Sequence, residues 1–162
     1  MQTTNNEVFE HLHQQYYAMV NTVCMGFLKG EKEMANDLSQ EVFINIWNAL
    51  DKFRNEASYK TWIYRITVNT CLQYLRKEKK IIKVPAENAE SLHTTIASDK
   101  HYKSLYVAIA ELNDIERLII MMVLEEMPYN EISKVMGITE ANLRVKIHRI
   151  KANLKKILQH EK

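Results

Sequence analysis

The sequence predicts an all-α protein of two small helical domains joined by a flexible linker, the second domain containing a helix-turn-helix. Apolar residues recur at steps of three and four along most of the 162-residue chain, the period of helices that bury one face. Only three Gly and two Pro residues are present, too few for a turn-rich all-β fold. Helical patterning stops between Ile81 and Lys100, a stretch too long for an ordinary loop within one compact domain.

Three helices are expected in the first domain. The first runs from about Asn6 to Leu28, and Gly30 is suited to end it because glycine tolerates the left-handed conformation that follows a helix. The second spans about Glu31 to Leu50. After a polar loop, Ser58 can cap a third helix from Tyr59 to about Lys79. The residues expected to face inward are Phe9, Leu12, Tyr16, Met19, Val20, Val23, Leu38, Val42, Ile46, Ala49, Trp62, Ile63, Ile66, Leu72 and Leu75.

The segment from Val84 to Lys100 is predicted to be the linker. It contains Pro85, many small polar residues and three acids, with no Lys or Arg between the acids. Such a composition is typical of extended segments between domains. We therefore expect a first domain at 1–80, a linker at 81–100 and a second domain at 101–162. The three acids are Glu87, Glu90 and Asp99.

Helical patterning resumes in the second domain. Leu105, Ile109 and Leu112 step by four and three, and Asp114 can cap the next helix. Pro128 separates that helix from a short one and a long last helix. The expected bounds of these two helices are Asn130 to Met136 and about Glu140 to Gln159.

The segment from Tyr129 to Lys151 has the pattern of a helix-turn-helix. Ser133 is small where two helices must cross closely, and Gly137 supplies the positive φ that the turn requires. Thr139 can cap the second helix. Ile132, Val135, Leu143, Ile147, Ile150, Leu154 and Ile157 would face inward. The opposite face presents the candidate DNA-binding residues Asn142, Arg144, Val145, Lys146, His148 and Arg149. The alternative is a basic amphipathic helix packed on a neighbour.

The small net charge of +2 conceals an uneven distribution. Residues 1–51 contain seven acids and two lysines, whereas residues 52–80 contain eight basic residues and two acids. The stretch from Arg144 to Lys162 contains seven basic residues and one acid. Two separate basic blocks favour two contacts with a polyanion, although solvated helix faces would give the same charge pattern.

Several functional classes are not supported by any motif. The sequence contains no Gly-rich phosphate loop, nucleophile elbow or HExxH metal motif, and its six histidines are scattered. We therefore predict no enzyme activity, no cofactor and no metal. A polar start and the absence of a long apolar stretch predict a cytoplasmic protein without membrane insertion. Cys24 and Cys71 are expected to be buried free thiols, with a disulfide as the alternative.

Two blocks of the sequence resemble a known family. The stretch from Ala35 to Trp47, and the stretch from Phe53 to Arg76, closely resemble region 2 of the extracytoplasmic-function (ECF) sigma factors of the sigma-70 family. Ala110 to Leu154 resembles their region 4. The two blocks occur in the family's order and, with the connector, cover nearly the whole chain. Two positions depart from the family pattern: Gln73 replaces a frequent acid, and Val145 replaces a small polar residue.

The resemblance implies an alternative sigma factor that binds core RNA polymerase and directs promoter recognition, melting and transcription initiation. The implied polymerase-binding residues are Asp37, Gln40, Glu41, Phe43 and Trp47, although Phe43 or Trp47 could instead belong to the core. The implied −10 DNA-binding residues are Arg54, Lys60, Arg65, Asn69, Arg76 and Lys77, and the face of the last helix would bind the −35 element. Trp62 fits either the core or a base-stacking platform.

The implied partners are core RNA polymerase, promoter DNA and an anti-sigma factor. The alternative function is a stand-alone helix-turn-helix transcriptional regulator whose first half dimerises or senses a signal. Such a regulator would bind a palindromic duplex without polymerase.

Overall fold

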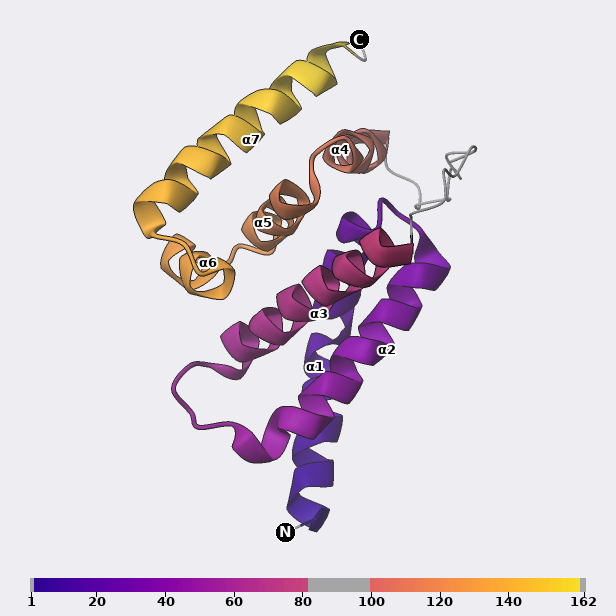
Figure 1. Ribbon diagram of the computed structural model, residues 1–162, viewed down its shortest axis with the longest axis vertical. Coiled ribbons are helices and arrows are strands. Elements are labelled where there is room, and N and C mark those ends of the chain that lie inside the picture. Colours follow the sequence, from indigo (N-terminus) through magenta and orange to yellow (C-terminus); the bar gives the residue numbers. More distant parts are fainter. Residues whose placement is uncertain (1, 82–99, 161–162) are drawn as a thin grey trace.

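A computed structural model of the chain describes residues 2–81 and 100–160 and confirms the predicted all-α class (Figure 1). Within these ranges the backbone forms seven α-helices and one 3-10 turn, with no strand. The predicted linker, with its acids Glu87, Glu90 and Asp99, lies almost entirely outside the described residues. None of the helices in the described ranges is both long enough and apolar enough to span a membrane.

The N-terminal half consists of α1 (Gln2–Phe27), α2 (Lys32–Ala49), the 3-10 turn η1 (Leu50–Lys52) and α3 (Tyr59–Ile81). The turn after α1 is closed as predicted by Gly30, whose φ is 84° and whose N–H donates to the Met25 carbonyl at 2.8 Å. Ser58 caps α3, since its Oγ accepts a hydrogen bond from the Thr61 N–H at 3.2 Å. These two signals therefore locate the helix ends from local sequence alone.

The C-terminal half consists of α4 (Lys100–Ala110), α5 (Asp114–Leu124), α6 (Tyr129–Met136) and α7 (Glu140–His160). The predicted cap of α5 is one residue too late. Asn113, not Asp114, is the N-cap: it accepts from the Glu116 N–H at 2.9 Å, and Glu116 accepts from the Asn113 N–H at 3.3 Å. This reciprocal pair requires a three-residue spacing, and Asn113 and Glu116 have it. Asp114 pairs instead with Arg117.

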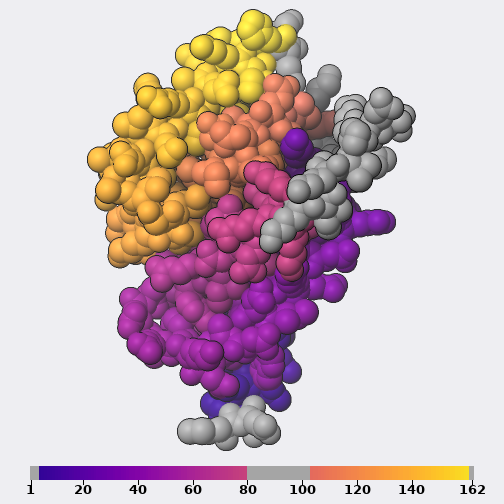
Figure 2. All heavy atoms as spheres, in the orientation of Figure 1, coloured from indigo at the N-terminus to yellow at the C-terminus, as the bar shows by residue number. Residues whose placement is uncertain are grey.

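The two halves pack directly against each other. Helix α1 contacts α5 and α4, and α3 contacts α6, so that one continuous cluster of buried residues extends through both halves. In Figure 2 the C-terminal half, orange to yellow, lies against the α3 side of the N-terminal half. We call this packing the closed arrangement. This contact was not predicted from the sequence.

Candidate nucleic-acid interface

The predicted polymerase-binding residues lie along α2 and differ in their exposure. Asp37 and Gln40 are exposed, and Glu41 is partly exposed. Trp47 has 43% of its surface exposed, whereas Phe43 has only 4%. The structure therefore places Phe43 in the core, the alternative that the sequence left open, where it presents almost no surface to a partner.

Phe43 belongs to an aromatic cluster between α1 and α2. The centroid of its ring lies 4.6 Å from that of His13 and 5.9 Å from that of Tyr17. Phe9 packs edge-on against Trp47, with ring centroids 5.2 Å apart. Offset and edge-on ring contacts of this kind stabilise one another and hold Trp47 in a defined orientation. Phe9 was predicted to face inward, whereas His13 and Tyr17 were not, although their spacing of four from Phe9 was a usable signal.

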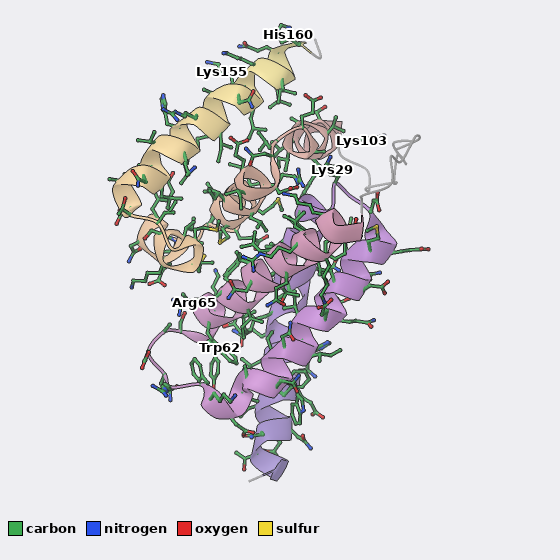
Figure 3. The ribbon with its side chains drawn as sticks, in the orientation of Figure 1. Lys29, Trp62, Arg65, Lys103, Lys155 and His160 are labelled. Carbon is green, nitrogen blue, oxygen red and sulfur yellow. The ribbon has the colours of Figure 1, made fainter. Side chains whose placement is uncertain are left out.

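A second aromatic group holds the loop that precedes α3. The rings of Phe53 and Tyr59 stack with centroids 4.4 Å apart, and the Trp62 ring lies 4.8 Å from Phe53. Trp62 is half-buried at the N-terminal end of α3 (Figure 3). Between the rings the loop exposes Arg54 and Asn55, and Asn55 adopts a φ of 56°. The loop thus combines an exposed arginine with packed aromatic side chains that support it, and both features are typical of proteins that bind single-stranded DNA.

Helix α3 carries the remaining predicted −10 residues, all of them exposed. Arg65, Asn69 and Arg76 follow one another at steps of four and seven, so they share one side of the helix. Arg65 lies on the side of α3 that faces α6 (Figure 3). Lys77 lies elsewhere on the helix, and its Nζ is 3.9 Å from a carboxylate oxygen of Glu41 on α2. Lys60 is exposed in the first turn of α3.

Helices α6 and α7 form the predicted helix-turn-helix. Gly137 ends α6 with a φ of 67°, and Thr139 Oγ1 accepts from the Asn142 N–H at 3.2 Å to cap α7. Leu143 and Ile147 anchor α7 in the core, with 0% and 3% of their surfaces exposed. The predicted DNA-binding residues Asn142, Arg144, Val145, Lys146, His148 and Arg149 are all exposed. The predicted division of α7 into an inner and an outer face is therefore confirmed.

Two side chains on the outer face of α7 differ in their contacts: Arg144 is held by neighbouring side chains, and Val145 is exposed. Arg144 pairs with Glu140 at 2.7 Å, and its guanidinium carbon lies 5.2 Å from the centroid of the Tyr129 ring. Val145 has 50% of its surface exposed, which is unusual for an apolar residue on a basic face. An exposed apolar side chain beside a guanidinium group suits the methyl group and acceptor atoms of the DNA major groove.

An open cavity of about 530 Å³ lies between the two halves of the molecule. Cations from both helices that carry predicted DNA-binding residues line it, together with two carboxylates of α5: Arg76 and Lys79 from α3, Lys146 and Arg149 from α7, and Asp114 and Glu116. Its wall also includes the N-terminus of α5. The closed arrangement therefore brings one predicted −10 residue, Arg76, and two predicted −35 residues, Lys146 and Arg149, around one shared space.

Cys24 and Cys71 are both buried free thiols, as expected. The Cys71 thiol interacts with that of Cys24, and this hydrogen bond together with burial raises the pKa of Cys71 well above its ordinary value. The pair belongs to the contact between α1 and α3. Within the described residues, no group of three or more His, Cys, Asp or Glu side chains is placed to hold a metal ion.

Comparison with known proteins identifies two family segments in the chain. The sigma-70 region 2 family matches residues 12–81, and the sigma-70 region 4 family matches residues 102–154. The chain is 27% identical to the RNA polymerase sigma factor YlaC of Bacillus subtilis, over 94% of this chain and 92% of that protein. It is 30% identical to the ECF RNA polymerase sigma-E factor of Escherichia coli K12, over 70% of this chain and 68% of that protein.

The fold also matches solved structures along almost its whole length. A sigma factor RpoE, solved in complex with the anti-sigma factor NepR from Bartonella quintana, superposes with a TM-score of 0.81 at 16% identity. The match covers 96% of this chain and 99% of that one. CnrH, solved in complex with the cytosolic domain of CnrY, gives a TM-score of 0.71 at 18% identity, over 97% and 91% of the two chains.

Proposed function

This chain belongs to the sigma-70 family and is an alternative sigma factor of the ECF class, and from this premise we propose how its surfaces direct transcription initiation. The observation that carries the proposal is the presence of both family segments in one chain, in the family's order, with exposed candidate residues in each. A stand-alone regulator would instead need a dimerisation or sensing domain beside its helix-turn-helix, and nothing in its function would call for region 2.

We assign polymerase binding to the exposed face of α2. Asp37, Gln40 and Glu41 supply polar and negative groups, and Trp47 is the aromatic anchor. Aromatic side chains with large exposed areas commonly dominate binding free energy, while surrounding charges set orientation and association rate. Phe43 contributes indirectly: it packs against Phe9, and Phe9 packs against Trp47 and orients it. Ile44, 59% exposed between these residues, belongs to the same surface.

The −10 element is assigned to the loop before α3 and to α3 itself. Arg54, Lys60 and Arg65 are placed to neutralise the phosphates of a separated strand, and the rings of Phe53, Tyr59 and Trp62 support the loop between them. Asn69 offers an exposed amide that can donate to and accept from a base edge. Arg76 and Lys77 extend the positive charge toward the end of the helix.

The −35 element is assigned to the outer face of α7. Arg149 and Arg144 are suited to guanine or phosphate, and Val145 to a thymine methyl group. Asn142, Lys146 and His148 complete this face. The chain contributes binding and strand capture, and the bond-forming chemistry belongs to polymerase. Because the chain works only together with polymerase and the chromosome, we expect it in the cytoplasm.

We further propose an anti-sigma factor as a regulatory partner. The support is that the similar RpoE structure is of a sigma factor bound to the anti-sigma factor NepR, that CnrH was likewise solved with a partner, CnrY, and that the likeness spans both halves of this chain. The surface that such a partner covers would include groups that polymerase or promoter DNA needs. Binding of the inhibitor and of polymerase would then exclude each other.

The polymerase assignment predicts that reversing two charges on α2 abolishes complex formation. Gel filtration of the chain with bacterial core RNA polymerase at moderate salt should give co-elution at one-to-one stoichiometry. The Asp37→Lys/Glu41→Lys double variant should elute separately, because two lysines replace the carboxylates that face the polymerase.

The matched control is Glu111→Lys/Glu126→Lys, which makes the same change of net charge on exposed residues of the C-terminal half. It should still co-elute. Separate elution of the wild-type chain, under conditions where a housekeeping sigma factor binds, would refute the proposed polymerase role.

A further inference from the structure

A single acidic residue lies at the start of α7, on its basic outer face. Glu140 is the first residue of this helix, and no other Asp or Glu occurs between it and His160. Steps of four place Arg144 and His148 on the same side of the helix as Glu140, and 43% of the Glu140 side chain is exposed. A negative charge beside a DNA-binding surface repels phosphates and weakens binding. Its presence there therefore requires another reason.

The helix terminus accounts for a negative charge at Glu140 but not for the direction of its carboxylate. Acids are favoured in the first turn of a helix because unpaired backbone N–H groups make this end positive. In α7 the cap is Thr139, whose Oγ1 accepts from the Asn142 N–H at 3.2 Å. The Glu140 carboxylate instead points along the helix, and its Oε1 accepts from Nη2 of Arg144 at 2.7 Å. Its direction is therefore set by Arg144.

Tyr129 holds the same guanidinium group from a second helix. It is the first residue of α6, which packs beside the start of α7 (Figure 1). The guanidinium carbon of Arg144 lies 5.2 Å from the centroid of the half-buried Tyr129 ring, and a cation over an aromatic face is attracted by it. Arg144 is thus held by one contact within α7 and one from α6, while 61% of its side chain stays exposed.

The other cations of the outer face are not held in this way. Within the described part of α7, Lys146, Arg149 and Lys151 make no ion pair and no contact with an aromatic ring. Such long side chains can follow the phosphates of any sequence. An arginine that is fixed before binding loses less conformational entropy when DNA arrives, and it offers its donors in one direction only. Arg144 therefore has, more than its neighbours, the properties of a residue that reads one base.

We propose that Glu140, together with Tyr129, positions Arg144 to read one guanine of the −35 element, and that Glu140 thereby determines specificity at this base pair. The proposal rests on the −35 role assigned above to α7. Arginine has five N–H donors, and the contact with Glu140 uses one at Nη2, so that others remain for N7 and O6 of guanine. Glu140 is a positioning residue: it weakens the attraction to phosphates and restricts the direction in which Arg144 can bind.

The test compares the base preferences of reconstituted holoenzymes. The −35 element of a promoter that the wild-type holoenzyme uses is randomised, and each sequence is linked to a transcribed barcode. The ratio of RNA to template then gives the base preference at every position. The wild type should favour guanine at one position about tenfold, as expected of a good contact between arginine and guanine. Arg144→Ala should abolish the preference at that position and identify it.

Glu140→Gln should lower this guanine preference about two- to threefold, the effect expected from losing an ion pair of this helical spacing. Preferences at the other positions should stay as they are. Adding Glu140→Gln to Arg144→Ala should have no further effect on base preference, because Glu140 acts only through Arg144. A loss of helix stability alone would lower transcription from every sequence and would leave the preferences unchanged.

Variants of Tyr129 test the second contact. Tyr129→Leu removes the ring and should lower the preference at the same position, whereas Tyr129→Phe keeps a ring face for the guanidinium group and should retain it. The matched control for charge is Glu111→Gln, which removes one carboxylate from an exposed residue of the C-terminal half outside α7. This control should leave all preferences unchanged.

Several outcomes would overturn the positioning role. They are a wild-type guanine preference in Glu140→Gln, an equal loss at every position, and an effect of Glu140→Gln that persists in Arg144→Ala. If Arg144→Ala changes no base preference, Arg144 contacts phosphates only, and the proposal is equally wrong. A wild-type chain that initiates at no promoter with an active core enzyme would refute the sigma role and this proposal with it. Normal initiation with unchanged preferences in Glu140→Gln would overturn the positioning role alone.

Discussion

The hydroxyl of Tyr64 is a polar group in an apolar environment that offers it no hydrogen bond. It lies at the contact between α3 and the C-terminal half, with its hydroxyl buried and without a partner among the described residues. Burial, and secondarily the negative charge of Glu125, raise the pKa of Tyr64 far above its ordinary value of 10.0. A buried hydroxyl without a hydrogen bond costs about 1–3 kcal/mol of stability.

Replacing Tyr64 by Phe should therefore raise the free energy of unfolding by about 1 kcal/mol, since the ring stays and the unsatisfied group is removed. The effect of pH should change as well. Because the folded pKa is raised, wild-type stability is intact below pH 10 and falls as pH rises above it, when the unfolded chain loses the proton first. Urea unfolding from about pH 8 to about pH 11 measures both effects.

Tyr74→Phe is the control for this prediction. The pKa of Tyr74 is also raised, by burial and by its hydrogen bond and proximity to Glu78. Its substitution removes a titrating phenol together with a hydrogen bond, so it should not stabilise the chain. A loss of stability in Tyr64→Phe as large as in Tyr74→Phe would mean that the Tyr64 hydroxyl has a partner.

For single residues, the sequence predicted which side of a helix a residue occupies better than it predicted which residues of other helices pack against it. The exposure of the outer residues of α7 was predicted correctly, because a helix period alone separates its two faces. Phe43 was assigned to a binding surface with the core as an alternative, because its burial depends on rings contributed by α1. Arg117 was missed, although a lone cation beside an uninterrupted apolar run, Leu118 to Met122, is a signal of a buried, paired charge.

Among the elements, the helix-turn-helix was the most predictable. Its turn depends on Gly137, which has a φ of 67°, and apart from the two adjacent residues of the chain no atom lies within 4 Å of the place that a Cβ atom would take there. The glycine is therefore required by the backbone conformation and not by space. A glycine that a turn requires for its backbone conformation can be recognised from the neighbouring residues alone.

Gly137→Ala should lower the free energy of unfolding by about 1 kcal/mol, because an alanine in the left-handed region is strained even where nothing is crowded. Gly137→Asn should cost less, since asparagine tolerates that conformation better. Thermal unfolding of the two variants measures the difference. Equal losses would indicate that a side chain of any kind is excluded by contacts, contrary to the geometry.

The N-cap of α5 was predicted one residue too late, at Asp114 instead of Asn113. Asn113 and Asp114 are both good N-cap residues, and only the position of Glu116 distinguishes them, since the capping box requires a spacing of three. The structure uses Asn113. The neighbouring Asp114 then becomes available to Arg117, and through Arg117 the start of α5 is linked to the end of α1.

For the whole molecule, the sequence predicted two helical units but not their contact. The residues that join them are far apart in the chain: 90 positions separate Phe27 from Arg117, and 70 separate Thr61 from Glu131. No periodicity or local motif encodes such a pairing. Gly26 within a helical pattern was the one local indication, because an isolated glycine in a helix often marks a close approach.

The closed arrangement also brings basic groups of α3 and α7 to one cavity, although the net charge of the chain is only +2. Lysines and arginines from α3 and α7 line this cavity together with Asp114 and Glu116 of α5, so that carboxylates offset part of the repulsion among the cations.

Transcription with purified core RNA polymerase tests the central claim most directly. Genomic DNA of the source organism is transcribed by core enzyme with and without this chain, and the 5′ ends of the transcripts are sequenced. Addition of the chain should produce discrete start sites preceded by shared −10 and −35 elements, and Arg149→Ala should weaken those that depend on the −35 element. No new start sites with an active core enzyme, or tight binding of a palindromic duplex without polymerase, would contradict the assignment as a sigma factor.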